Sequence, residues 1–121
     1  MKSNEYIGSV TPNCQDWTVV VVRGGFPPAL FTPQAAHDAG FEIIGAFGWG
    51  HCAASAHQLA ASILWEEFSR PTLVMEWSDL FVREVISARN MNESFHLTSE
   101  QIREWYDEHK SAGTRHAVAA F

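Results

Sequence analysis

The sequence predicts one α+β domain, in which a small, mostly antiparallel sheet of about three strands packs with three helices that follow it. Consecutive β-branched residues at 19–22 favour a strand, because branching at Cβ stiffens χ1 and suits a pleated backbone. Later apolar residues recur every three or four positions, as on one helix face. At 121 residues the chain has the size of one domain. We divide it into a strand-rich part (5–47), a helical part (54–111) and a short apolar tail (113–121).

The strand-rich part contains three candidate strands. The first starts at residue 6 and stops near Pro12, and the second is the continuous apolar run at 17–22. Such a run is typical of a strand covered on both faces. Paired glycines at 24–25 predict a tight turn after it, and two prolines make the segment 27–33 an edge strand or a loop. Weak alternation at 41–47 predicts the third strand.

The first two predicted helices differ in the number of their apolar faces. The helix at 55–68, capped by Ser55, carries one apolar stripe. The helix at 71–90, with Pro71 in its first turn, carries two apolar stripes. Its main stripe consists of Leu73, Val74, Trp77, Leu80, Phe81 and Val85, and its second stripe of Met75, Val82 and Ile86. The second stripe needs a cover, which the third helix, the tail or a second copy could supply, and we favour a homodimer through Met75, Val82 and Ile86.

The third predicted helix has a clear start. Thr98 and Gln101 form a capping box, in which each side chain reaches a free N–H of the other residue. Leu97 can form a hydrophobic staple with Ile102. Gly113 is expected to end the helix.

Composition excludes several classes of partner. The formal net charge is −6, whereas nucleic acids and anionic membranes are bound by clustered Lys and Arg. Cys14 and Cys52 are expected to be free thiols. The start of the sequence lacks a secretion signal, and no apolar stretch approaches the ~20 residues that span a bilayer. We therefore expect a cytoplasmic protein that binds neither nucleic acid directly nor a membrane.

Four segments together resemble a known family. They are Tyr-x-Gly at 6–8, Phe-x-Trp-Gly at 47–50, Gln-Leu-Ala-x-x-Ile-Leu at 58–64 and Leu-Thr-x-x-x-Ile-x-x-Trp at 97–105. Their order and spacing resemble a bacterial and phage family known only as domain of unknown function 6166. The resemblance covers about residues 6–106. It implies no established activity, but it does imply a gene of a phage or another mobile element, with an accessory or counter-defence role.

The sequence departs from the family in one loop. The family's loop between Trp-Gly and the next helix is rich in Gly, Ser and Pro, and such a loop could hold an anion with its backbone N–H groups. Here residues 51–56 read His-Cys-Ala-Ala-Ser-Ala. Alanine lacks the backbone freedom of glycine, so a ligand-cradling role is not carried over to this chain.

His51, Cys52 and His57 form the one cluster with ligand chemistry. Imidazole and thiolate suit zinc, but a structural site needs a fourth ligand. A thiolate at Cys52 with His57 one turn into the helix could also act as a nucleophile and its base, although no third, orienting residue is evident. We therefore expect no metal, no cofactor and no catalysis. A small Cys/His-dependent enzyme or a zinc-binding protein that uses these three residues stays the alternative.

The remaining candidates are binding surfaces. Trp49 and Trp65 do not fit a core stripe, and Trp is frequent among the residues that dominate protein interfaces. The adjacent acids Glu66 and Glu67 are expected to diverge on a helix surface. The acidic residues of the third helix that we assign to binding are Glu100, Glu104, Asp107 and Glu108. We thus expect a non-enzymatic protein-interaction module, an accessory protein that antagonises a host defence complex in the manner of an anti-CRISPR protein.

Overall fold

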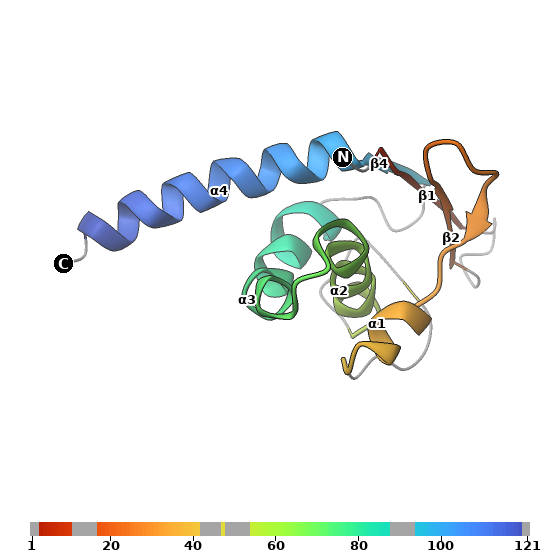
Figure 1. Cartoon of the computed structure of the whole chain (residues 1–121), viewed down its shortest axis with the longest axis horizontal. Coiled ribbons are helices and arrows are strands. Elements are labelled where there is room, and N and C mark those ends of the chain that lie inside the picture. The colour runs from red at the N-terminus through yellow and green to blue at the C-terminus, as the bar shows by residue number, and fades with distance from the viewer. Residues whose placement is uncertain (1–2, 11–16, 42–46, 48–53, 88–93, 120–121) are drawn as a thin grey trace.

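A computed structural model describes residues 3–10, 17–41, 47, 54–87 and 94–119. These residues form a four-stranded antiparallel sheet and several helices, which confirms the predicted α+β class. The strands are β1 (Glu5–Val10), β2 (Trp17–Val22), β3 (Ala29–Leu30) and β4 (Phe95–Thr98), and their order in the sheet is β3-β2-β1-β4. In Figure 1, α1, α2 and α3 lie together on one side of this sheet.

The sheet corrects three details of the sequence prediction. The segment 27–33 contains the short edge strand β3, while residues 42–46 of the strand predicted at 41–47 lie outside the described residues. β4 lies within the part that we predicted to be helical. On β2, Val19 and Val21 are buried whereas Val20 and Val22 are half-buried. The strand is therefore fully covered on one face only, and the expectation of two covered faces is wrong.

β4 places the start of the described chain beside the start of α4. It pairs with β1 so that Tyr6 lies opposite Leu97 and Glu5 opposite Thr98. Phe95 and Leu97 are buried and His96 between them is exposed, the two-residue alternation of a strand with one face on the core. This pairing places the first described residues beside the start of the last helix.

The helices are α1 (Gln34–Asp38), α2 (Ala54–Phe68), α3 (Pro71–Phe81), the π-helical turn η1 (Val82–Ile86) and α4 (Ser99–Ala119). The side chains of Leu59, Ile63 and Leu64 on α2 are fully buried, as the predicted stripe requires. α4 does not end at Gly113 but continues to Ala119, so the prediction of a separate tail from residue 113 is wrong. Figure 1 shows α4 as a long helix that extends away from the sheet.

The three residues of the second apolar stripe differ in burial. In η1 the N–H of Ser87 donates to the carbonyl of Val82 at 2.7 Å, five residues back. Val82 and Ile86 are fully buried within one copy of the chain, while Met75 is 75% exposed. The three residues therefore do not form one exposed stripe, and self-association stays a prediction.

Candidate functional site

A groove of about 1110 Å³ lies where β1, the end of β2, the α2–α3 junction and the start of α4 meet. We call it the α4 groove. It is lined by residues 3–5 and 22–26, by Phe68 and Arg70, and by residues 98–100, 103–104 and 106–107 of β4 and α4. Its walls therefore come from segments that are far apart in the sequence.

Local sequence signals shape two edges of the α4 groove. The capping box is confirmed, because the N–H of Thr98 donates to Gln101 Oε1 at 2.9 Å and the N–H of Gln101 donates to Thr98 Oγ1 at 3.2 Å. At the other edge, the N–H of Phe26 donates to the carbonyl of Arg23 at 2.9 Å, which closes the predicted turn. Gly25 has a φ of +83° there, a conformation that glycine adopts without steric cost. The turn leaves Phe26 70% exposed at the rim.

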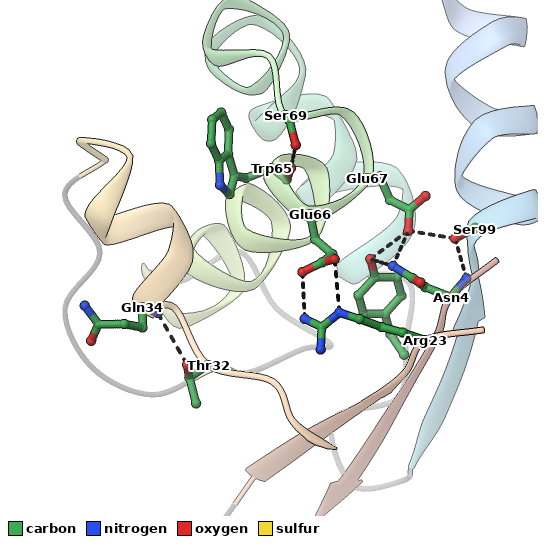
Figure 2. Close-up of polar contacts among 10 residues, drawn as sticks. Asn4, Arg23, Thr32, Gln34, Trp65, Glu66, Glu67, Ser69 and Ser99 are labelled. Atoms are coloured by element: carbon green, nitrogen blue, oxygen red, sulfur yellow. Dashed lines mark hydrogen bonds and ion pairs between the residues drawn. The ribbon is translucent and has the colours of Figure 1, made fainter. Parts of the chain in front are cut away.

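Behind the groove, the carboxylate of Glu67 joins β1, α2 and α4. Its Oε2 accepts hydrogen bonds from the Tyr6 hydroxyl at 2.7 Å, from the Ser99 hydroxyl at 2.7 Å and from the Asn4 amide at 3.3 Å. Asn4 and Ser99 are also joined directly, because each backbone N–H donates to an oxygen of the other residue. Figure 2 shows these contacts converging on one carboxylate oxygen. We call the four residues, with Arg103, the Glu67 network.

Arg103 covers the other oxygen of Glu67 from the groove side. Its Nη2 donates to the backbone carbonyl of Glu67 at 2.9 Å, and its Nε lies 3.7 Å from Glu67 Oε1. That separation is too long for a hydrogen bond, and both atoms lack a hydrogen-bond partner among the described residues. The Arg103 guanidinium also lies 5.0 Å from the centre of the Phe68 ring, within cation–π range.

Burial governs the protonation of Tyr6. Desolvation first, and then the negative charge of Glu67, raise the pKa of the Tyr6 phenol far above its ordinary value of 10.0. The phenol therefore stays protonated at neutral pH and donates its hydrogen bond to Glu67. Because it is fully buried, it serves as a fixed donor in the network.

Glu66, the neighbour of Glu67, points to a different partner. It accepts two hydrogen bonds from Arg23, from Nε at 3.2 Å and from Nη2 at 2.8 Å. These contacts raise the pKa of the Arg23 guanidinium above its ordinary value. Figure 2 shows the two carboxylates side by side on α2, one facing Arg23 and the other the network. The predicted divergence is therefore correct, but the predicted surface position of Glu67 is wrong.

Three of the four predicted acidic binding residues line the α4 groove. Glu100, Glu104 and Asp107 are on its wall, whereas Glu108, exposed on the same helix, is not. Among the described residues, no hydrogen bond or ion pair holds the side chains of the three lining acids. The structure thus places these three acids on the wall of one groove, whereas the sequence predicted only an acidic surface on the helix.

The other predicted site residues do not line the groove. Trp65 is half-buried and its ring lies 5.9 Å from that of Phe41. His57 Nδ1 lies 3.3 Å from Asp79 Oδ1. Trp49, His51 and Cys52 lie outside the described residues, so whether the predicted Cys/His cluster converges stays open. Within the described part of the chain, no group of three or more potential ligands is placed to hold a metal ion.

Sequence reasoning missed the Glu67 network, although one signal pointed to it. Glu67 follows Ile63 and Leu64 by four and three residues, so it continues the apolar stripe of α2. An acid on a buried stripe requires donors, and Tyr6, Asn4 and Ser99 supply them. No local pattern, however, relates residues 4–6 to residue 99.

Fold and site together define a small α+β protein with a charged groove built over a buried carboxylate. Residues 7–108 match the family of unknown function DUF6166, and the chain belongs to this family. No curated protein and no solved structure matches this chain. Among the described helices, none is both long enough and apolar enough to span a membrane.

Proposed function

We propose that this chain is a non-enzymatic protein-binding module and that the α4 groove is its docking surface. The observation that carries the proposal is the composition of the groove wall. Glu100, Glu104 and Asp107 stand unpaired along one side, and the exposed ring of Phe26 stands at the rim. Exposed aromatic anchors beside polar groups are typical of the surfaces that proteins use to bind one another.

The groove is better suited to binding than to catalysis. Among the described residues its lining contains no His or Cys, and the buried phenol of Tyr6 behind it donates its hydrogen bond to the buried acid Glu67. Its volume of about 1110 Å³ slightly exceeds the roughly 300–1,000 Å³ of small-molecule pockets. A loop or an extended segment of another protein would fill such a space.

For the cellular role, we propose a cytoplasmic accessory protein of a phage or mobile element that antagonises a host defence complex. The resemblance described in the sequence analysis motivates this role, and an acidic module suits a partner with a basic surface. The expected result is that expression of the chain restores phage plating on a host that carries the target defence system. A panel of defence systems on which plating never changes would contradict the role.

The docking surface can be tested separately from the role. A photo-crosslinking residue at position 26 should form a specific adduct in host cells, and Glu104→Lys should abolish it because it reverses charge on the groove wall. Glu108→Lys is the matched control, since it makes the same change on the same helix outside the groove. Equal loss in both variants would show that overall charge, and not the groove, directs the contact.

One observation favours a second candidate, the Cys/His-dependent enzyme or zinc-binding protein that uses His51, Cys52 and His57. Asp79 lies 3.3 Å from His57 Nδ1, and a carboxylate at that nitrogen orients the imidazole of a catalytic base. If this candidate is correct, thiol labelling of Cys52 should show a pKa well below the ~8.5 of a free thiol, and Asp79→Asn should change it. Stoichiometric zinc in the purified protein would favour the metal site instead.

A further inference from the structure

Four histidines of the described chain lie beside a carboxylate, and one of them differs from the other three. His37, His57 and His96 each place one ring nitrogen 3.1–3.9 Å from a carboxylate oxygen. A neutral imidazole has one N–H, so it can donate to one such acceptor without a second proton. His109, in contrast, has an acceptor at each of its two ring nitrogens.

The two acceptors of His109 come from α4 and η1. Its Nδ1 lies 2.8 Å from the backbone carbonyl oxygen of Trp105, one turn earlier on α4. Its Nε2 lies 2.5 Å from Oε1 of Glu84 on η1. The indole N–H of Trp105 donates to the same Oε1 at 3.2 Å, and because an indole nitrogen can only donate, this carboxylate oxygen is an acceptor.

The doubly protonated ring satisfies both contacts of His109. A neutral imidazole has one N–H and one lone pair, so its lone pair would face either the carbonyl oxygen of Trp105 or the carboxylate of Glu84. The imidazolium has an N–H at each position, and its charge strengthens the hydrogen bond to the carboxylate. The Trp105 ring, 4.8 Å away and tilted by 32°, packs beside the imidazole and keeps it between the two acceptors.

The His109 contact adds a charge-dependent link to an apolar one. One turn earlier, the Trp105 ring lies 5.0 Å from that of Phe81 and 6.0 Å from that of Trp77 on α3. None of these three rings titrates, so this packing does not change with pH. The link between His109 and Glu84 lies further along α4 and depends on a proton.

The other charged groups near this link have different partners. Among the described residues of η1, Glu84 faces the imidazole, while the Nε of Arg83 donates to the backbone carbonyl of Asp79 at 3.4 Å. On α4, Lys110 Nζ lies 5.8 Å from the centre of the Tyr106 ring. Glu84 is therefore the charged group that the structure places against His109.

We propose that His109 is a pH-sensitive tie between α4 and η1, complete when its imidazole carries two protons and weakened when it loses one. Histidine is the side chain that ordinarily changes its charge between about pH 5 and pH 8. Raising the pH through this range should therefore loosen α4 beyond Trp105 while the aromatic packing stays in place. This behaviour is separate from the proposed function, because it requires no partner.

NMR of the ¹⁵N-labelled protein measures the protonation of each ring, because long-range ¹H–¹⁵N correlations distinguish one N–H from two. Between about pH 5 and pH 8, His109 should keep both protons to a higher pH than His96, whose side chain is 53% exposed. Glu84→Gln keeps an accepting oxygen but removes the charge, so it should lower the pH at which His109 loses its second proton. A neutral His109 at a pH where His96 still carries two protons would overturn the inference.

Hydrogen exchange shows whether this proton holds the helix. Over the same pH range, the protection factors of amides around residue 109 should fall about two- to fivefold, the size of a partly exposed ion pair. His109→Gln should abolish this fall, while the control His96→Gln should keep it, and circular dichroism shows whether both variants are folded. Protection that does not change with pH in the wild type, or that still falls in His109→Gln, would overturn the inference. The wild-type titration tests it even if His109→Gln does not fold.

Discussion

Two neighbouring regions beside the same turn of α2 hold acids in different ways. At the junction of β1, α2 and α4, Glu67 is fully buried and accepts three hydrogen bonds at one oxygen. Just past the end of β2, Arg23 forms a two-point clamp with Glu66, and this pair is only partly exposed, with 41% of the Arg23 side chain and 17% of the Glu66 side chain accessible. The two acids are consecutive in the sequence. Because successive residues of an α-helix point about 100° apart, Glu67 faces the buried junction and Glu66 faces Arg23, just past the end of β2.

The difference in burial predicts that the two acids contribute differently to stability. An exposed ion pair competes with water and gains about 0–1 kcal/mol. A buried acid gains little from the pairing itself, but its removal leaves several donors without an acceptor in a region that excludes water. We therefore expect the two regions to respond very differently to the same substitution.

The largest effect is expected for Glu67→Ala. The change leaves the Tyr6 hydroxyl, the Ser99 hydroxyl and the Arg103 guanidinium without their carboxylate, so the free energy of unfolding should fall by about 3–5 kcal/mol. Urea denaturation followed by circular dichroism measures it. Glu66→Ala is the matched control on the same helix. A loss below about 1 kcal/mol for Glu67→Ala would show that the junction is no more important than the clamp.

The next effect concerns pH and again belongs to the buried junction. Burial and Glu67 raise the pKa of the folded-state Tyr6 phenol above its unfolded value of about 10. Its contribution to stability is therefore fully present below pH ~10 and is lost as the pH rises further, at up to about 1.4 kcal/mol per pH unit. Tyr6→Phe should be less stable at neutral pH by about 1–3 kcal/mol, because a hydrogen bond to a charged acceptor is lost. Its decline above pH ~10 should be shallower than that of the wild type, and identical slopes would contradict the assignment.

A smaller effect is expected at the clamp. Glu66→Ala and Arg23→Ala should each lower the free energy of unfolding by less than about 1 kcal/mol, and the coupling between them should be of similar size. High salt should reduce the coupling, since the Debye length falls to about 3 Å at 1 M. A double-mutant cycle at two salt concentrations measures this. A coupling of several kcal/mol that salt leaves unchanged would contradict this prediction, because it would show that the pair of Arg23 and Glu66 behaves as a buried ion pair.

The smallest effect on stability is expected on the outer face of α4. Neutralising Glu100, Glu104, Asp107 and Glu108 together should leave the melting curve nearly unchanged, because surface substitutions away from special features usually cost less than about 0.5 kcal/mol each. Partner binding should nevertheless weaken and lose most of its salt dependence. Unchanged binding would assign these acids to solubility, and a large loss of stability would show that they support the fold.

Several features could be predicted from the sequence because their causes lie within a few residues. The capping box of Thr98 and Gln101 and the turn at Gly24–Gly25 are local, and the stripe of α2 depends only on spacing along one helix. The acidic wall was predicted as a set of residues, but not as part of a groove. The groove depends on β1, α2 and α4 meeting, which no single segment specifies.

The sequence by itself determined the α+β class, the family and the positions of its strongest local signals. Tertiary structure alone decided that residues 95–98 pair with β1, that Ile86 is buried within one copy of the chain and that Glu67 is buried beside Tyr6 and Ser99. The physical reason is the range of the forces involved. Propensities and caps act within one or two turns, whereas strand pairing and the burial of a charge depend on which distant segment is available as a neighbour.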